Sequence, residues 1–294
     1  MYKNRKITVI IPALNEEPSI AKVVNGLLEL QVCSHCQNVI QTDVAETEID
    51  PKIEDNFPIN VTRLNRAGAT LCADSCCGVA VVDQIIVCDN GSTDDTASIA
   101  SSCGAIVVNE PIQGYGAACL AALAAPIEKD VIVFVDGDHS VVPQELPALL
   151  DPMFEGADLV IGSRTLGQRE KGALSVPQEI GNKLASTLLR LLWGGNVTDL
   201  GPFRAITQQA LTSINMSDKK FGWTVEMQIR ALQLSLNTVE VPVSTRQRIG
   251  KSKISGTVLG VIGAAHGILG TIGKLYWRQV TGAFTSVQRN EKPS

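Results

Sequence analysis

Residues Asp130–Ser140 read DVIVFVDGDHS, and this stretch decides the fold class that we predict for the chain. The apolar run Val131–Val135 is followed at once by Asp136-Gly137-Asp138. This pattern is typical of a buried parallel strand whose carboxyl end opens into a site, and ligands of open α/β sheets bind at such ends. Two carboxylates separated by one glycine can face a hard cation that also holds phosphate oxygens. Taken alone, the stretch is equally typical of an acidic turn with a glycine hinge.

The composition bounds the class of protein. With 294 residues, 45% hydrophobic and 19% charged, the chain can form a globular domain with a sizeable core. Its net charge of −5 argues against a general nucleic-acid-binding protein, and its 4% of aromatic residues would supply few stacking platforms. The N-terminus MYKNRKITVIIP enters a strand directly and lacks the apolar core of a signal peptide. We therefore predict a cytoplasmic protein, either free or at the inner face of the membrane.

Strands and helices alternate along the first part of the chain. We expect strands at Lys6–Ile11, Asp83–Val87, Ala105–Val108, Val131–Val135 and Asp158–Gly162. We expect helices at Ser19–Leu30, Ala117–Ala125 and Pro143–Met153. This order predicts an α/β fold, a Rossmann-like, largely parallel sheet flanked by helices. The turn after the first strand lacks G-x-G-x-x-G, which argues against a NAD(P) oxidoreductase.

Residues from about 31 to 82 interrupt this alternation. They separate a helix from a strand by far more than the roughly two to six residues usual in such units, so we interpret them as a surface insertion with a short helix near Val61–Cys72. The insertion carries Cys33-x-x-Cys36 and Cys72-x-x-x-Cys76-Cys77. These spacings are compatible with a zinc or iron–sulfur site, and idle thiols on a surface loop are the alternative.

The second half of the chain departs from the alternation. We expect a helix at Asn182–Trp193, a turn-rich stretch at Thr198–Arg204, a helix from Phe221 to about Leu234, and a strand at Thr238–Val243. The segment Arg246–Lys253 that follows has four cationic residues in eight. Such a run is usually a solvated basic face, but after a strand it equally suits an anion site.

Residues 254–273 carry no formal charge, and their number is close to the ~20 residues needed to span a bilayer. Their glycines lie three and four positions apart, at Gly260, Gly263, Gly267, Gly270 and Gly273. Because a glycine costs about 1 kcal/mol per helical position, this stripe favours close packing within the protein, in a homo-oligomer or at a membrane. We therefore divide the chain into a domain at 1–253 and a C-terminal Gly-rich apolar helix with its tail at 254–294.

Three segments at predicted strand ends resemble the nucleotide-sugar-binding segments of family 2 glycosyltransferases, which are inverting enzymes with the GT-A fold. They are Ile11–Glu17 (IPALNEE), Asp89–Asp94 (DNGSTD) and Asp136–Asp138 (DGD). Further segments resemble the branch that contains the dolichyl-phosphate mannose and glucose synthases, namely Gly162–Arg164, Asp199–Arg204, Glu226 and Arg248–Lys253. The resemblance covers nearly the whole chain except residues 31–82.

The resemblance implies a role for particular residues. It implies that the base and ribose of the nucleotide-sugar donor are held by Pro12, Ala13, Leu14, Glu16 and Asp89. Gly114, Gly137 and Lys253 are further candidates for donor binding. The resemblance also implies that Asp136 and Asp138 hold Mg²⁺ or Mn²⁺ across the diphosphate. Two departures stand out: Leu14 replaces an aromatic residue of many relatives, and Ser140 stands where the synthases often have glutamine. From the residues alone, Gly114-Tyr115-Gly116 before a helix is only a weak indication of a ligand near the backbone.

The acceptor decides which further side chains are needed. Loss of the nucleotide leaves negative charge on the β-phosphate, which a divalent cation and basic side chains can neutralise. A lipid phosphate is already anionic and could be clamped by Arg164, Arg204, Arg248 and Lys253. A hydroxyl acceptor needs a general base, for which Asp199 or Glu226 is the candidate. The structural alternatives are a helix-surface carboxylate for Glu226 and a salt bridge with Asp199 for Arg204.

The leading hypothesis is a metal-dependent inverting glycosyltransferase that moves a sugar from a UDP- or GDP-sugar to a polyprenyl or dolichyl phosphate. One alternative keeps the donor but glycosylates a soluble hydroxyl. Another is a non-catalytic nucleotide-sugar-binding scaffold whose insertion recruits a partner. The pair Asp136 and Asp138 argues against the scaffold, because a binding protein does not need paired metal ligands.

Overall fold

The computed structural model describes residues 2–33, 39–40, 78–126, 129–250 and 258–282. Its centre is a seven-stranded sheet with the order β10-β8-β9-β7-β1-β5-β6. The strands are β1 (Ile7–Ala13), β5 (Gln84–Asp89), β6 (Ile106–Asn109), β7 (Val131–Phe134), β8 (Leu159–Ser163), β9 (Arg204–Thr207) and β10 (Thr238–Pro242). Each strand predicted from the sequence is present, with ends shifted by one or two residues.

The sheet is parallel except for one strand. β1 pairs in parallel with β5 and β7, β5 with β6, and β10 with β8. β9 lies between β7 and β8 and runs antiparallel to both. The prediction of a largely parallel α/β sheet is therefore confirmed, but β9 was not expected: it begins at Arg204, the last residue of the stretch that we expected to be rich in turns. Four residues that begin with an arginine carry too little periodicity to be recognised as a strand.

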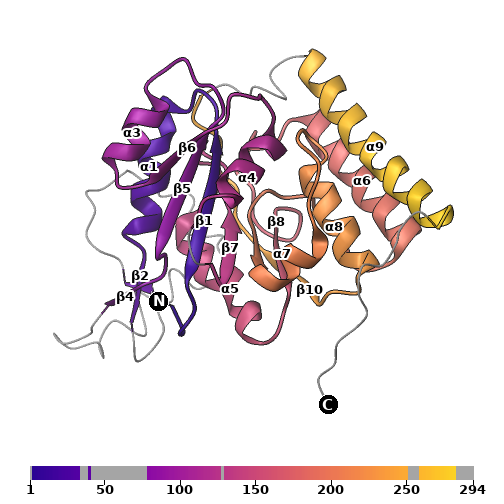
Figure 1. Ribbon diagram of the computed structural model, residues 1–294, viewed down its shortest axis with the longest axis horizontal. Coiled ribbons are helices and arrows are strands. Elements are labelled where there is room, and N and C mark those ends of the chain that lie inside the picture. The colour runs from indigo at the N-terminus through magenta and orange to yellow at the C-terminus, as the bar shows by residue number, and fades with distance from the viewer. Residues whose placement is uncertain (1, 34–38, 41–77, 127–128, 251–257, 283–294) are drawn as a thin grey trace.

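Helices cover both faces of the sheet (Figure 1). Alternate residues of a strand point to opposite faces. Val9 and Ile11 of β1 therefore pack with α1 (Glu17–Leu28), α3 (Thr96–Ser102) and α5 (Leu146–Phe154), the last of which follows the short 3₁₀ helix η2 (Pro143–Glu145). Ile10 belongs to the core of the other face, which is formed with α4 (Tyr115–Leu123), α7 (Gln208–Ile214) and α8 (Trp223–Gln233).

A further layer lies outside α8. There α6 (Val176–Trp193) and α9 (Val258–Val280) share a smaller core with α8, built around Leu189, Ile229 and Ile272. α6 begins six residues before the expected Asn182, because Ser175 and Gln178 form a capping box and Pro177 stands in the first turn.

The insertion is described only at its two ends. β2 (Gln31–Cys33), β3 (Val39–Ile40) and β4 (Gly78–Ala80) form a separate three-stranded antiparallel sheet. Val81 and Val82, the last residues of the predicted insertion, are buried in the main core. The helix expected near residues 61–72 and the side chains of the cysteine cluster lie outside the described residues.

The glycine stripe of α9 packs against the protein along part of its length. A Cβ atom added to Gly267 would lie 3.2 Å from Cβ of Phe221, whereas one added to Gly270 or Gly273 would meet nothing within 4 Å. Among the helices of the described chain, none has the length and hydropathy that a membrane span requires. The domain division at residue 253 stays a prediction.

The different surroundings of Gly267 and Gly273 predict different effects of substitution by alanine. Gly273→Ala should raise the free energy of unfolding by up to about 1 kcal/mol, because alanine favours the helix and its methyl group enters open space. Gly267→Ala should give a smaller gain or a loss, because its methyl group presses on Phe221. Urea denaturation of both variants measures the difference. Equal gains would contradict the close packing of α9 at Gly267.

Candidate functional site

The loops that follow β1, β5 and β7 are bonded to one another at the carboxyl edge of the sheet. Asn15 N donates to Ser92 Oγ at 2.9 Å, and Thr93 N donates to Asn15 Oδ1 at 2.7 Å. Ser19 Oγ donates to Gly137 O at 2.8 Å. Asn15 has a φ of 52°, in the left-handed region that asparagine tolerates well. The three motifs singled out in the sequence are therefore neighbours in space.

The predicted donor residues lie along these loops. Pro12 and Ala13 end β1, and Leu14 and Glu16 follow as partly buried loop residues. Asp89 at the end of β5 is 8% exposed. This arrangement collects the predicted nucleotide side on two adjacent strands, and the donor roles themselves stay predictions.

Gly114 has a different neighbour from the one that we expected. Its N–H donates to Asn90 Oδ1 at 2.7 Å. A Cβ atom at Gly114 would lie 2.1 Å from Lys219 O, and one at Gly116 would lie 2.0 Å from Asp218 O. The chain's own backbone therefore makes a close approach that requires both glycines, whether or not a ligand binds there.

The two carboxylates after β7 have different surroundings. Tyr115 OH donates to Asp136 Oδ1 at 3.1 Å, and Ser140 N donates to Asp138 Oδ1 at 3.0 Å. Asp138 is 4% exposed. Burial, with the neighbouring charge of Asp138, raises the pKa of Asp136 to about 7. The site therefore holds two carboxylates whose negative charges repel each other.

The basic loop after β10 lies over this acid pair. Arg248 Nη2 is 2.9 Å from Asp138 Oδ2 in an ion pair. Two backbone bonds fix the loop: Arg246 N donates to Ser140 O at 3.0 Å, and Ile249 N donates to Asp138 O at 2.9 Å. Lys253, which we also expected here, lies outside the described residues.

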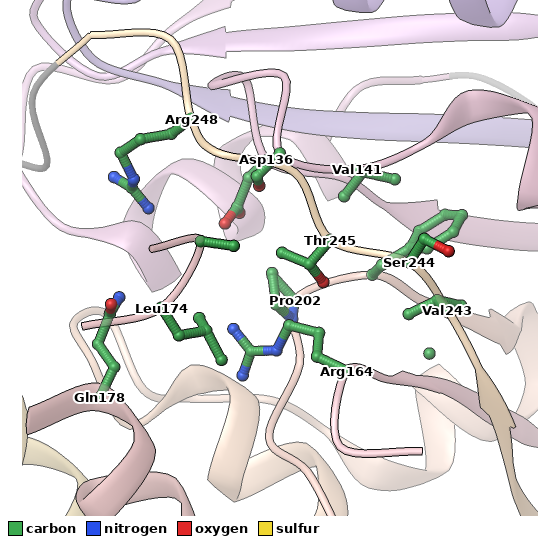
Figure 2. Close-up of a pocket in the computed structure, with 14 residues that line it drawn as sticks. Asp136, Val141, Arg164, Leu174, Gln178, Pro202, Val243, Ser244, Thr245 and Arg248 are labelled. Atoms are coloured by element: carbon green, nitrogen blue, oxygen red, sulfur yellow. The ribbon is translucent and has the colours of Figure 1, made fainter. Parts of the chain in front are cut away.

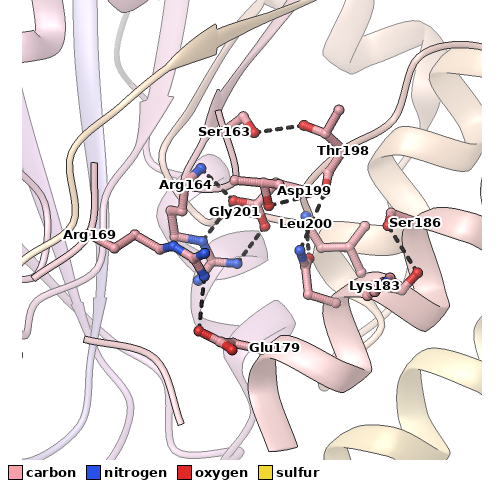
Figure 3. A network of polar contacts seen from close by, with 12 residues as sticks. Ser163, Arg164, Arg169, Glu179, Lys183, Ser186, Thr198, Asp199, Leu200 and Gly201 are labelled. Carbon is pink, nitrogen blue, oxygen red and sulfur yellow. Dashed lines mark hydrogen bonds and ion pairs between the residues drawn. The ribbon is translucent and has the colours of Figure 1, made fainter. Parts of the chain in front are cut away.

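Arg164 and Asp199 form a two-pronged ion pair (Figure 3). Arg164 Nε donates to Asp199 Oδ2 at 2.8 Å, Nη2 donates to Oδ1 at 2.7 Å, and the backbone N–H of Arg164 also donates to Oδ2. Burial acts to raise the pKa of Asp199, but the bonds from Arg164 outweigh it and hold that pKa below its usual range. Both oxygens of Asp199 are thus occupied by one arginine.

Asp136, Arg164 and Arg248 line one pocket (Figure 2). Leu174, just before α6, and Gln178, in its first turn, lie on another side of the pocket. The pocket thus places one carboxylate and two guanidinium groups around a common space. Such a set can hold a metal ion and anionic oxygens together.

Two predicted site residues lie elsewhere. Glu226 is 2% exposed, accepts from Ser217 N, Ser217 Oγ and Asp218 N at 2.6–3.0 Å, and pairs with Arg230 at 2.8 Å. It borders a second pocket, beside α9. The alternative of a helix-surface carboxylate for Glu226 is wrong, because the side chain is buried.

Arg204 is fully buried and donates to the backbone carbonyls of Leu200, Gly201 and Thr224. Burial lowers its pKa to about 10. The expected salt bridge with Asp199 is not formed, since Asp199 is paired with Arg164. Arg204 therefore links the turn that precedes β9 to the start of α8. Its guanidinium is buried and is not accessible to an acceptor.

Two residues that lie at the site were not expected from the sequence. Tyr115, which donates to Asp136, stands between the two glycines of the weak G-x-G motif. A hydroxyl in that motif was the one feature of the sequence that could have indicated its role. Gln178 gave no signal, because it lies before the predicted start of its helix. In the described part of the chain, no group of three or more His, Cys, Asp or Glu side chains could hold a metal ion. A metal on Asp136 and Asp138 would thus need ligand oxygens from substrate or water.

Comparisons with known proteins agree with this picture. A family model described as glycosyl transferase family 2 matches residues 72–213. An uncharacterised glycosyltransferase of Mycobacterium tuberculosis is 37% identical over 182 residues, which are 61% of this chain and 81% of that protein. Dolichyl-phosphate hexose transferase of Haloferax volcanii is 35% identical over 172 residues, 58% of this chain and 73% of that protein.

Among solved structures, glucosyl-3-phosphoglycerate synthase from Mycobacterium tuberculosis, in complex with Mn²⁺, UDP-glucose and phosphoglyceric acid, has a TM-score of 0.63. It is 22% identical and covers 93% of this chain and 80% of that one, so the two share a fold. The sequence identity to the two relatives extends over most of their lengths. The chain therefore belongs to glycosyl transferase family 2.

Proposed function

We propose that this glycosyltransferase is metal-dependent and inverting, and that it moves a sugar from a UDP- or GDP-sugar to a polyprenyl phosphate. One observation carries the proposal. Asp136 at the end of β7 lines the same pocket as two arginines, Arg164 and Arg248. A carboxylate for a cation and two guanidinium groups for anions are what a reaction between two phosphate-bearing substrates requires.

The residues present fit a divalent metal. Asp136 and Asp138 offer hard carboxylate oxygens, and burial together with the neighbouring charge of Asp138 raises the pKa of Asp136. Mg²⁺ is commonly held by one or two carboxylates together with substrate phosphates. When bound, such an ion would neutralise charge on the departing diphosphate. The Mn²⁺ and UDP-glucose named for the solved neighbour support the same choice of ligands.

Arg164 and Arg248 are suited to hold phosphate oxygens. Asp199 binds Nε and Nη2 of Arg164, which fixes the plane of the guanidinium and leaves Nη1 for a ligand. Arg248 is anchored through one nitrogen to Asp138. Each arginine is thus oriented by a buried carboxylate and keeps further donors.

The two candidate bases, Asp199 and Glu226, are both held by hydrogen bonds as carboxylates of lowered pKa, which favours a phosphate acceptor over a hydroxyl. Asp199 has both oxygens bonded to Arg164 and a lowered pKa. Glu226 also has a lowered pKa, because bonds from Ser217 and Asp218 outweigh its burial, and it borders the other pocket. A hydroxyl acceptor needs a base, but a phosphate is already anionic. The dolichyl-phosphate hexose transferase among the relatives supports this choice.

The acceptor can be tested with matched lipids. The purified protein is incubated with Mn²⁺, a UDP- or GDP-sugar, and either a polyprenyl phosphate or the corresponding polyprenol. We expect lipid-linked sugar only with the phosphate, and none in EDTA. Equal product with the polyprenol, or with a soluble alcohol in place of the lipid, would overturn the proposed acceptor.

Replacement of Asp136 should separate stability from metal binding. Because the pKa of Asp136 in the folded protein, about 7, lies above its ordinary 3.8, ionisation destabilises the fold. That destabilisation grows from about pH 4 and is complete above pH 7. At pH 8 in EDTA, Asp136→Asn should therefore raise the free energy of unfolding by about 1 kcal/mol or more. In thermal-shift assays the variant should lose the stabilisation by UDP with Mn²⁺.

Asp138→Asn provides the matched control. It should lose the same stabilisation by UDP with Mn²⁺, but without a gain in EDTA, because it breaks the ion pair of Arg248. If Asp136→Asn keeps the wild-type response to Mn²⁺, the metal assignment fails.

Arg248→Gln should weaken binding of the acceptor more than binding of the donor. We expect KM for the polyprenyl phosphate to rise at least about tenfold, since a charge-assisted bond is lost. The Kd for UDP with Mn²⁺ should change much less, and isothermal calorimetry measures it. Arg169→Gln is the control, because Arg169 is an exposed arginine paired with Glu179. Equal losses of donor and acceptor affinity in Arg248→Gln would refute this division.

A further inference from the structure

The outer face of α6 carries a strip of exposed aliphatic side chains. Its members are Val176 (68% exposed), Ile180 (64%), Leu184 (48%) and Leu191 (76%). Their spacing places them on one side of the helix. Ala185 and Leu189, on the opposite side, are buried in the core shared with α8 and α9. In the described chain, therefore, one face of α6 is packed and the other presents aliphatic groups to solvent.

α9 continues this apolar surface at the edge of the molecule. Leu269, Trp277 and Val280 are 41%, 69% and 63% exposed. The rings of Trp193 and Tyr276 meet edge to face at 6.0 Å, which brings the C-terminal ends of α6 and α9 together. Figure 1 shows the two helices side by side, on the side of the sheet away from α1 and α3. We call these exposed residues of α6 and α9 the outer apolar face.

The charges on these two helices are mostly positive. Lys183 and Arg190 are exposed on α6, whose single acidic residue, Glu179, is paired with Arg169 at 3.0 Å. α9 carries Lys274 and Arg278 and no acidic residue between Val258 and Val280. The chain as a whole has a net charge of −5. Lys183 and Arg190 thus lie beside the outer apolar face, where they would complement anionic headgroups, whereas Lys274 and Arg278 line the second pocket with Glu226.

The outer apolar face adjoins the pocket proposed for the acceptor. Gln178, in the first turn of α6, lines that pocket together with Arg248 and Asp136. Val176 and Ile180, on either side of Gln178 in the sequence, belong to the exposed strip. The strip therefore begins where the pocket is lined by α6.

We propose that the outer apolar face lies on the surface of an anionic lipid bilayer. The aliphatic side chains and Trp277 enter the boundary between headgroups and acyl chains, and Lys183 and Arg190 lie among lipid phosphates. The pocket is then held at the level of the headgroups, where the phosphate of a membrane-embedded polyprenyl phosphate lies. This last role rests on the proposed function, whereas binding to the bilayer does not.

The charges favour a bilayer over a second copy of the chain. In a two-fold symmetric dimer the same surface meets itself. Lys183 and Arg190 of one copy would then face the same basic side chains of the other copy, which opposes association. An anionic bilayer supplies the opposite charge along the whole face.

Vesicle flotation tests the proposal without donor or acceptor. The full chain is mixed with vesicles of phosphatidylcholine alone or of phosphatidylcholine with phosphatidylglycerol. We expect binding that requires phosphatidylglycerol and that weakens with salt. Ile180→Asp and, separately, Leu191→Asp should each lower the partition coefficient at least about tenfold. The matched control is Ile112→Asp, since Ile112 is 60% exposed and lies in the β6–α4 loop, and its binding should equal that of the wild type.

Several outcomes would overturn the proposal. They are no binding of the wild type to the anionic vesicles, equal losses in all three variants, or a wild-type dimer that Ile180→Asp converts to a monomer. Two variants at opposite ends of α6, each checked by circular dichroism, keep the test valid if one fails to fold. Because the assay contains neither substrate, its failure is distinguishable from failure of the proposed reaction.

Discussion

The repulsion between two neighbouring carboxylates is the constraint that the site depends on. Asp136 and Asp138 follow a fully buried strand, so their charges meet in surroundings that solvate them poorly. The nearby groups answer this with donors and positive charge: Tyr115 OH on Asp136, a backbone N–H on Asp138, and the guanidinium of Arg248. The raised pKa of Asp136 shows that these groups compensate the charge only in part. The fold thus tolerates a local destabilisation at the place where a cation is useful.

The position of Arg164 in the pocket depends on the antiparallel strand β9. β9 lies between β7 and β8, and the turn that precedes it therefore passes beside the end of β8. This position brings Asp199 to Arg164 although they are 35 residues apart in the sequence. The buried guanidinium of Arg204 then holds the turn through backbone carbonyls at Leu200, Gly201 and Thr224. One short strand with a buried charge at its start thus orients the arginine that faces the pocket.

The position of the loops after β1, β5 and β7 could be predicted from the sequence, and the partners of the charged residues in the second half only in part. Segments such as Pro12–Glu16 and Asp136–Asp138 follow apolar strands directly, so position in the sequence also gives position in the fold. Arg164, Asp199, Arg204 and Glu226 were selected because their segments resemble the synthase branch, but their partners are set by tertiary packing. β9 is too short for its alternating pattern to be recognised in the sequence. Without β9, the sequence does not indicate that Asp199 pairs with Arg164 and not with Arg204. The partners of Glu226 could not be predicted either, because its hydrogen-bond donors, Ser217 and Asp218, belong to a loop before its helix.

The balance of charge in the pocket suggests how the two halves of the site work together. Asp199 cancels Arg164 and one carboxylate of the acid pair cancels Arg248, so the described groups carry one uncompensated negative charge on Asp136 when it is ionised. In that state the pocket repels a diphosphate and a lipid phosphate alike. A divalent cation would reverse the sign, and the two arginines would then act on anions in a site of net positive charge. On this argument the arginines alone do not make an anion site. They depend on the carboxylates beside β7 having their cation.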